Sequence, residues 1–270
     1  PCRGSFSPMA IETNAIVWEK RPELKNPLLI AAFEGWNDGG SASTNAMRRL
    51  IKAFDAERFA RLDPEEFYVF SESRPTVKLV DGRARRIDWQ SNDFYHAHLP
   101  GTDQDVILFL GVEPNLRWRT YCANLTALAQ HQNVKTVVTL GAYLADVLYT
   151  LPVQVTGFAS SIEIEEKHGL RRSSYEGPTG IVGVFTDYCR QRELSTLSLW
   201  AAVPYYISIP NPKAVHSLLN KLRSIYSLQL DLGALEKEAD TFDNEINDVV
   251  AKDPNVAAYV RELKKREFLN

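Results

Sequence analysis

The 270-residue sequence is poor in cysteine and histidine, with only three and five residues of these types. Cys2, Cys122 and Cys189 stand far apart, so no pair has the C-x-x-C spacing of a multi-cysteine metal site. An odd number of scattered cysteines is typical of free thiols in a reducing compartment. We therefore expect a cytoplasmic protein whose thiols stay reduced.

Long apolar runs and an excess of basic residues are also missing. The longest apolar tract, Leu197–Ile209, is interrupted by serine and proline and is shorter than the ~20 residues that a membrane-spanning helix needs. The N-terminus lacks the basic-then-apolar order of a signal peptide. Lysine and arginine number 31 against 34 acidic residues, a balance that excludes a dedicated nucleic-acid binder. We expect neither a membrane nor a nucleic acid as partner.

Motifs that identify common enzyme classes are absent as well. The sequence contains no G-x-S-x-G, H-E-x-x-H, P-loop or G-x-G-x-x-G match. His96 and His98 would lie on one face of a strand, as a metal site requires, but no third ligand has sequence support. A surface pair is the favoured interpretation, and we expect no metal ion and no cofactor.

Alternating strands and helices are the main pattern that is present. The runs Leu28–Phe33, Val106–Leu110 and Val134–Leu140 are apolar throughout, which predicts central, mutually parallel strands buried on both faces. The fold class is therefore α/β, with a mainly parallel sheet flanked by helices. Further strands are expected at Phe67–Phe70, Thr76–Val80, Val153–Ala159 and Leu197–Val203, a basic turn at Arg83–Arg86, and helices at Ser41–Phe54, Asn115–His131, Gly180–Glu193 and Pro212–Tyr226.

The C-terminal residues have a different pattern. An apolar stripe with coiled-coil spacing is broken at Lys252–Asn255 and then resumes, which predicts an antiparallel helical hairpin. Folding back would set the basic residues 264–266 beside Glu236 and Glu238. The hairpin either packs on its own domain or reaches a partner. We expect a flexible segment at 1–20, an α/β domain at 21–230 and the hairpin at 231–270. The stripe consists of Leu235, Ala239, Phe242, Ile246 and Val249, followed by Val256, Tyr259, Val260 and Leu263.

In a parallel α/β sheet the loops that follow the strands meet at one edge, which we call the C-terminal rim, and ligands bind there. The loops expected at this rim carry polar, aromatic and glycine residues that suit a binding site. Five of the candidates are expected to line one common depression at this rim, namely Asn37, Asp38, Glu113, Arg117 and Glu176. The candidates are Gly35, Trp36, Asn37, Asp38, Glu113, Asn115, Arg117, Tyr175, Glu176, Thr179 and Lys213.

Several of these candidates have a purely structural alternative. The backbone N–H groups of residues 37–40 would bind an anion at a helix start, or Asp38 or Ser41 caps that helix while the glycines form the turn. Asn115 either supplies an amide to the site or is the N-cap of the next helix. Arg117 contacts an anion or pairs with Glu113.

Five segments in the same order as in a known family are Gly35–Gly40, Gly111–Trp118, Tyr175–Gly180, Ser198–Pro204 and Pro212–Ala214. Together they resemble the actinobacterial branch of the proteasome assembly chaperone family. The resemblance implies a phosphorylase/hydrolase-type α/β fold and homo-oligomers, often trimers, with no agreed reaction. Leu148–Pro152 and Tyr205 replace a Pro-His-Thr-Arg-Pro segment and a histidine that family members often carry, so acid–base chemistry is in doubt.

Two functions follow from these observations. The resemblance implies a non-catalytic, homo-oligomeric, chaperone-like protein that binds a protein partner. The alternative is a small-molecule-binding protein or a hydrolase- or phosphorylase-type enzyme, with Gly35–Gly40 as an anion site and Glu113 or Glu176 as a base. A closed pocket with buried carboxylates would favour the enzyme, and an open apolar patch would favour the protein partner.

Overall fold

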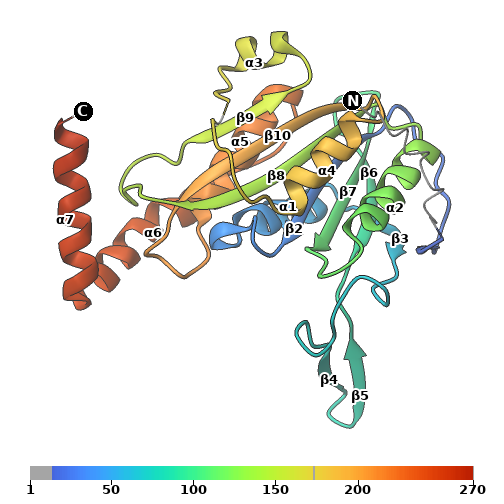
Figure 1. Cartoon of the computed structure of the whole chain (residues 1–270), viewed down its shortest axis with the longest axis horizontal. Coiled ribbons are helices and arrows are strands. Elements are labelled where there is room, and N and C mark those ends of the chain that lie inside the picture. Colours follow the sequence, from blue (N-terminus) through green and yellow to red (C-terminus); the bar gives the residue numbers. More distant parts are fainter. Residues whose placement is uncertain (1–13, 173, 270) are drawn as a thin grey trace, which may run out of the picture.

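Strand β2 (Leu28–Glu34) lies at the centre of an eight-stranded sheet because its first six residues are apolar and buried. The computed structural model describes residues 14–172 and 174–269, and Figure 1 shows the sheet with its helices. The strand order is β1-β3-β6-β7-β2-β8-β10-β9. The other strands of this sheet are β1 (Ile16–Trp18), β3 (Glu57–Leu62), β6 (Asp93–His98), β7 (Asp105–Val112), β8 (Thr136–Ala145), β9 (Val155–Ala159) and β10 (Ser195–Pro204).

The four central strands are parallel, which confirms the prediction for the three apolar runs. β2 pairs in parallel with β7 on one side and with β8 on the other, and β8 pairs in parallel with β10. The outer strands β1, β3, β6 and β9 pair antiparallel with their neighbours. All loops that follow the central strands therefore leave from one edge, the C-terminal rim.

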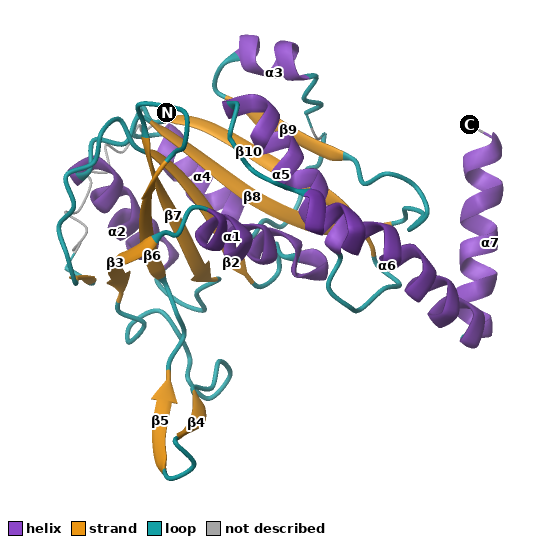
Figure 2. Ribbon diagram, turned by 180° about the vertical axis from the view of Figure 1, so that it is seen from behind, coloured by secondary structure: helices purple, strands orange, loops and turns teal. Residues whose placement is uncertain are grey.

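Alternate residues of β2 serve two separate hydrophobic cores, as the strand period of two requires. Leu28, Ile30 and Ala32 face α1 (Ala42–Ala53) and α5 (Pro212–Tyr226). The intervening residues, which include Phe33, face α2 (Trp118–His131) and α4 (Ile181–Arg190). Helices thus cover both faces of the sheet, as Figure 2 shows from behind. A short helix, α3 (Ile162–His168), follows β9.

Three local predictions were wrong. Phe67–Phe70 is not a strand: it is a turn in which Phe67 is fully buried and the Tyr68 hydroxyl donates to the Val112 carbonyl at 2.7 Å. The expected basic turn is displaced: the turn lies at 81–83 and contains Arg83, whereas Arg85 and Arg86 belong to strand β5 (Ala84–Asp88). Within the segment expected to be flexible, Ile16–Trp18 forms edge strand β1, while residues 1–13 lie outside the described residues.

The β4–β5 hairpin projects from the body of the molecule. Strand β4 (Thr76–Val80) pairs antiparallel with β5 in a separate two-stranded sheet, which we call the arm (residues 76–88). Figure 1 shows the arm below the main sheet. Its two legs connect β3 to β6, and β6 begins opposite Leu110 at the C-terminal end of β7. The arm therefore leaves from the C-terminal rim.

The tail consists of α6 (Gly233–Lys252) and α7 (Pro254–Leu269), the two helices expected there. Phe242 and Ile246 of α6 pack with Leu148, Tyr149 and Ile207, which lie in the loops that follow β8 and β10. The tail thus leaves from the same rim as the arm, on the opposite side of β2 (Figure 2).

The ion pairs expected between the two tail helices are not those that form. Glu236 contacts His216 at 3.4 Å and Glu238 pairs with Arg49 at 2.5 Å, while residues 264–266 have no ion-pair partner within the described part of the chain. The acidic side chains at the start of α6 point towards α1 and α5, the helices beneath it, and are satisfied there.

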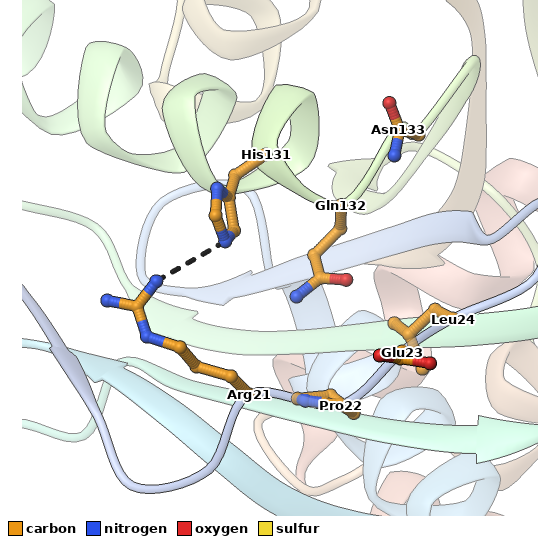
Figure 3. A pocket seen from close by; sticks show the side chains of 7 residues that line it. All are labelled: Arg21, Pro22, Glu23, Leu24, His131, Gln132 and Asn133. Carbon is orange, nitrogen blue, oxygen red and sulfur yellow. Dashed lines mark hydrogen bonds between the residues drawn. The ribbon is translucent and has the colours of Figure 1, made fainter.

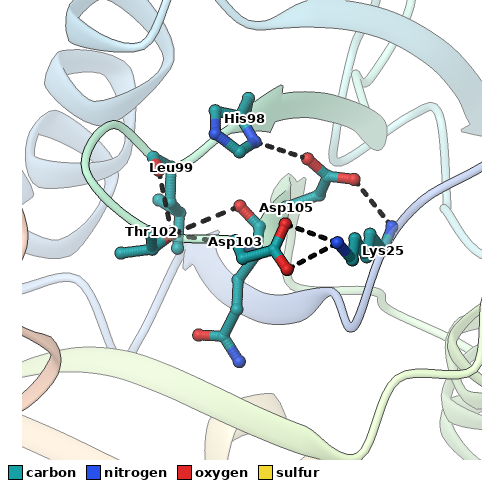
Figure 4. Close-up of polar contacts among 7 residues, drawn as sticks. Lys25, His98, Leu99, Thr102, Asp103 and Asp105 are labelled. Carbon is teal, nitrogen blue, oxygen red and sulfur yellow. Dashed lines mark hydrogen bonds and ion pairs between the residues drawn. The ribbon is translucent and has the colours of Figure 1, made fainter.

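At the edge opposite the rim, His98 and Asp105 form a polar cluster with Lys25 (Figure 4). The His98 ring lies 3.1 Å from Asp105, and Lys25 donates to Asp105 through its backbone and to Asp103 through its ammonium. His96 instead packs edge-on against Phe59. Within the described ranges no group of three histidine, cysteine or acidic residues has the arrangement of a metal site. Among the helices described above, none is long and apolar enough to cross a membrane.

Candidate functional site

The loop after β2 is shaped by one glycine and one aspartate. Gly35 has φ +134°, and a Cβ at this position would lie 2.8 Å from Glu113 Cβ, so the turn requires glycine. Asp38 accepts hydrogen bonds from the backbone N–H groups of Ser43 (2.8 Å) and Thr44 (3.1 Å) and from both of their hydroxyls. These bonds occupy the carboxylate, so Asp38 caps the first turn of α1, which is the structural alternative given for this residue.

An open groove of about 400 Å³ lies beside this loop. Three of the eleven candidate residues line it: Gly35, Trp36 and Asp38. The other walls come from the end of β8 and from the loop that follows β10, so three adjacent strands contribute to the groove. The remaining lining residues are Gly39, Gly40, Ser41, Leu144, Tyr205, Ile207, Ser208, Ile209 and Pro210. Together with Gly35, Trp36 and Asp38, these residues form what we call the groove.

Asn37 and Glu113 bridge the central strands to α4 instead of lining the groove. Asn37 is buried. Its backbone carbonyl accepts a hydrogen bond from Ala142 N–H at 2.8 Å, and its side-chain amide oxygen accepts one from Val182 N–H at 3.4 Å. Glu113 accepts from Ile181 N–H at 3.4 Å. Partial burial raises the pKa of Glu113 above its usual value, while the Ile181 N–H lowers it. Both side chains serve the first turn of α4.

The raised pKa of Glu113 makes its replacement by glutamine informative. The folded state favours the neutral form of Glu113, because its folded-state pKa lies above the unfolded value. This contribution to the free energy of unfolding is fully present below pH ~4.3 and is lost as the pH rises through the folded-state pKa. Glutamine stays neutral and its carbonyl can still accept from Ile181 N–H. We expect Glu113→Gln to be as stable as the wild type near pH 4 and up to about 0.5 kcal/mol more stable near pH 7.

Urea unfolding at both pH values measures this difference. Glu176→Gln is the matched control, because Glu176 is an exposed carboxylate on the loop before α4. A Glu113→Gln protein clearly less stable than the wild type at neutral pH would contradict the prediction, since it would mean that the ionised carboxylate makes favourable contacts.

Asn115 and Arg117 hold the base of the arm. The Asn115 amide oxygen accepts from Val69 N–H at 3.0 Å and from the Ser73 hydroxyl at 3.1 Å. Arg117 forms an ion pair with Glu66. Asn115 is therefore not the N-cap of α2, which begins at Trp118, and Arg117 does not pair with Glu113 as proposed from the sequence. Asn115 and Arg117 thus contact the segment 66–73, which leads from β3 to the arm.

The remaining candidates lie on either side of the groove. Tyr175, Glu176 and Thr179 are exposed on the loop before α4, where the Tyr175 hydroxyl donates to the Pro178 carbonyl at 3.0 Å. Lys213 pairs with Asp243 of the tail at 2.8 Å and donates to the Tyr149 carbonyl. Lys213 thus fastens the tail to the rim, a role that the sequence did not indicate.

Apolar side chains are the main feature of the rim surface. Trp36 is 61% exposed, Leu144 57%, Tyr205 49% and Ile209 43%. Trp36 was predictable from the sequence, whereas Leu144 and Ile209 were missed. For Ile209 there was a usable signal, since an apolar residue stands there between Ser208 and Pro210. Leu116, Tyr143, Leu151 and Tyr175 are further exposed apolar residues in rim loops or at the end of β8.

A second pocket of about 390 Å³ lies far from the candidate residues, at the edge opposite the rim (Figure 3). Arg21 reaches across it to the His131 ring at 3.4 Å and packs on Trp18, with 4.8 Å between the guanidinium carbon and the ring centre. Since Arg21 lies at the C-terminal end of α2, it complements the negative end of that helix. The pocket contains none of the residues selected from the sequence.

A match to a protein-family profile identifies the family of this chain. The profile of the PAC2 family matches residues 32–250, which include every element from the end of β2 to the tail. This chain belongs to the PAC2 family. The matched range spans the groove, the arm and most of α6. A search of curated proteins finds no match.

Solved structures of PAC2 proteins have the same fold. The chain is 41% identical to a proteasome-assembly chaperone homologue of Mycobacterium tuberculosis, with a TM-score of 0.79 over 86% of this chain and 99% of that one. It is 40% identical to a PAC2 family protein of Streptomyces avermitilis, with a TM-score of 0.78 over 87% and 99%. An archaeal proteasome activator of Pyrococcus furiosus shares the fold at 19% identity, with a TM-score of 0.71 over 87% and 97%.

Proposed function

We propose that this PAC2 protein is a non-catalytic, homo-oligomeric, assembly-chaperone-like protein that binds protein partners through its C-terminal rim. The observation that carries the proposal is the apolar surface of the groove, where Trp36, Leu144 and Tyr205 each leave about half or more of their surface exposed. Contiguous exposed apolar surface of this kind marks protein-interaction sites in soluble proteins. Exposed tryptophan and tyrosine are the residue types that contribute most to binding at such sites.

The polar groups around the groove support a protein partner over a small-molecule substrate. Small-molecule sites combine an enclosed pocket with a few free polar groups that orient the ligand. Here Asp38 is occupied in capping α1, Lys213 is paired with Asp243, and Glu113 accepts from the start of α4. The groove itself is open, and its large exposed side chains are the apolar ones of Trp36, Leu144 and Tyr205.

The family supports the chaperone-like part of the proposal. The Mycobacterium tuberculosis protein that is 41% identical is described as a proteasome-assembly chaperone homologue. By the resemblance of the sequence motifs, we propose a homotrimer. We place the protein in the cytoplasm, where Cys122 and Cys189, both buried and free, remain reduced.

Affinity purification from the native host tests the rim. The tagged wild type is compared with the groove variant Trp36→Ser/Leu144→Ser, and Phe158→Ser/Ile162→Ser is the matched control with two exposed apolar residues on β9 and α3. We expect a defined set of proteins, proteasome subunits where the host makes them, to fall at least about tenfold with the groove variant only.

Exposed substitutions change stability by about 0.5 kcal/mol or less, so thermal unfolding should show all three proteins folded. Recovery of the same proteins in equal amounts with the groove variant and the wild type would refute the proposal.

A further inference from the structure

The arm has one polar face and one apolar face. In the antiparallel register Val77 lies opposite Ile87 and Leu79 lies opposite Arg85, so these four side chains share one face. Val77 is 55% exposed, Leu79 66% and Ile87 50%. The other face carries Lys78, Arg86 and Asp88, which pair with one another at 2.6 and 2.8 Å. The charges of Lys78, Arg86 and Asp88 on the polar face are therefore satisfied within the arm, and the apolar face is left uncovered.

An isolated two-stranded hairpin with this exposure is marginally stable in water. The base of the arm is fixed by Asn115 and by the edge-on contact of Phe70 with Trp89, whose ring centres are 4.8 Å apart. Residues 76–87 beyond this base are exposed at every position. Fixing the base while leaving the apolar face open is the arrangement expected of an arm that docks on another surface.

We propose that the apolar face of the arm docks into the groove of a second copy of this chain. This inference rests on the proposed function and names the protein that occupies the same rim. Most of the large hydrophobic side chains that the described residues leave exposed belong to the arm and its base or to the rim. One contact, arm into groove, would cover a substantial part of both surfaces.

Charge favours the same contact. Arg85 lies within the apolar face and has no ion-pair partner among the described residues. Asp146, just after β8, is exposed and lies close to Tyr259, whose ring packs on Tyr205 and whose pKa is raised by burial and by this carboxylate. Asp146 also has no cation as partner among the described residues. Arg85 of one copy can pair with the carboxylate beside the groove of the next, or stack on its exposed tryptophan, Trp36.

The geometry selects a second copy over self-docking or arm-to-arm contact. In both Figure 1 and Figure 2 the arm points away from the sheet, so its tip does not turn back to the groove of its own chain. Two arms packed on the same face would bring Arg85 against Arg85, which is unfavourable. A contact between two different surfaces forms a ring when the rotation between successive copies closes, and a ring of three would give the trimer proposed above.

Variants of the two faces of the arm test the proposal. The arm variant is Val77→Thr/Leu79→Thr/Ile87→Thr, and the control is Val80→Thr/Ala84→Thr, a cross-strand pair on the opposite face. Threonine keeps the strand propensity in both. We expect a wild type larger than its 30.5 kDa chain mass in sedimentation velocity. The dissociation constant should rise at least about 100-fold for the arm variant and less than about threefold for the control.

Mixing identifies which surfaces meet. The arm variant and the groove variant Trp36→Ser/Leu144→Ser should each sediment as one chain, because each has lost one side of every contact. Their mixture should form a two-chain particle, in which the intact arm of the groove variant fills the intact groove of the arm variant. Arm-to-arm or groove-to-groove contacts would not give this particle.

Hydrogen exchange of the wild type tests the contact without any substitution, so its result does not depend on whether a variant folds. Amides of the arm and of residues 205–210 should gain protection together as the protein concentration rises above the dissociation constant. A monomeric wild type at micromolar concentration, an arm variant that keeps the wild-type oligomer, or protection of the arm without the groove would each overturn the inference.

The two proposals fail separately. Loss of the two-chain particle with unchanged capture of host proteins would leave the proposed function and remove the arm contact. If the arm and groove hold an oligomer together but the protein captures no host protein, the arm contact stands and the proposed binding of host proteins is refuted.

Discussion

Deletion of residues 235–270 is expected to prevent cooperative folding of the rest of the chain. Leu235 packs in the core that α1 and α5 share, and Phe242, Ile246 and Val250 cover the apolar loops after β8 and β10. Burial of each large apolar side chain contributes roughly 1.5–3 kcal/mol, so these four together approach the ~5–15 kcal/mol that stabilises a whole domain.

Thermal unfolding followed by circular dichroism, with light scattering for aggregation, measures the effect. Removal of α7 alone is the graded comparison, since it takes away Val260 and Leu263 but leaves the contacts of α6. Val249→Ala is the matched point control because this side chain of α6 is 54% exposed. A shortened chain that melts cooperatively close to the wild-type temperature would support a separate unit at 231–270, as the sequence predicts.

Replacement of Phe33 by alanine is expected to lower the free energy of unfolding by about 3–5 kcal/mol. Phe33 is fully buried, with its ring centre 5.4 Å from Phe109, 5.9 Å from Phe185 and 6.3 Å from Tyr121. The cavity left by the ring would lie directly under the loop that carries Trp36. The substitution should therefore disturb the groove as well as the core.

Urea denaturation measures the loss, and Phe158→Ala on β9 is the control because its ring is 37% exposed. The control should lose less than about 1 kcal/mol. If Phe33→Ala and Phe158→Ala cost the same, the aromatic cluster around Phe33 contributes little, and the assignment of the second core to the face of α2 and α4 is wrong.

Element boundaries show where sequence patterns succeed and where they fail. β2, β7 and β8 were predictable because a strand buried on both faces must be apolar at every position. β3, with the sequence Glu-Arg-Phe-Ala-Arg-Leu, was missed because it is half-buried and its charged residues interrupt the apolar run. Phe67–Phe70 has the composition of a strand, but the tertiary structure uses Phe67 as an anchor for a turn.

The candidate site was predictable only as a location. Parallel strands bring their C-terminal loops to one rim whatever the loops contain, so the rim followed from strand order. The partner of each polar side chain did not, because several partners within reach compete in three dimensions. Asp38 caps α1, Arg117 pairs with Glu66 and Lys213 pairs with Asp243, and each of these choices removes a charge from the predicted site.

The sequence by itself determined that this protein is an α/β PAC2 protein without the familiar catalytic motifs, because buried strands and ordered motifs are local properties of the chain. Only the tertiary structure decided which surfaces stay open. Thr76–Val80 reads as a strand whether it is covered or not, and its exposure depends on whether another element of the fold packs on it. The uncovered apolar arm and groove are therefore features that three-dimensional packing alone could reveal.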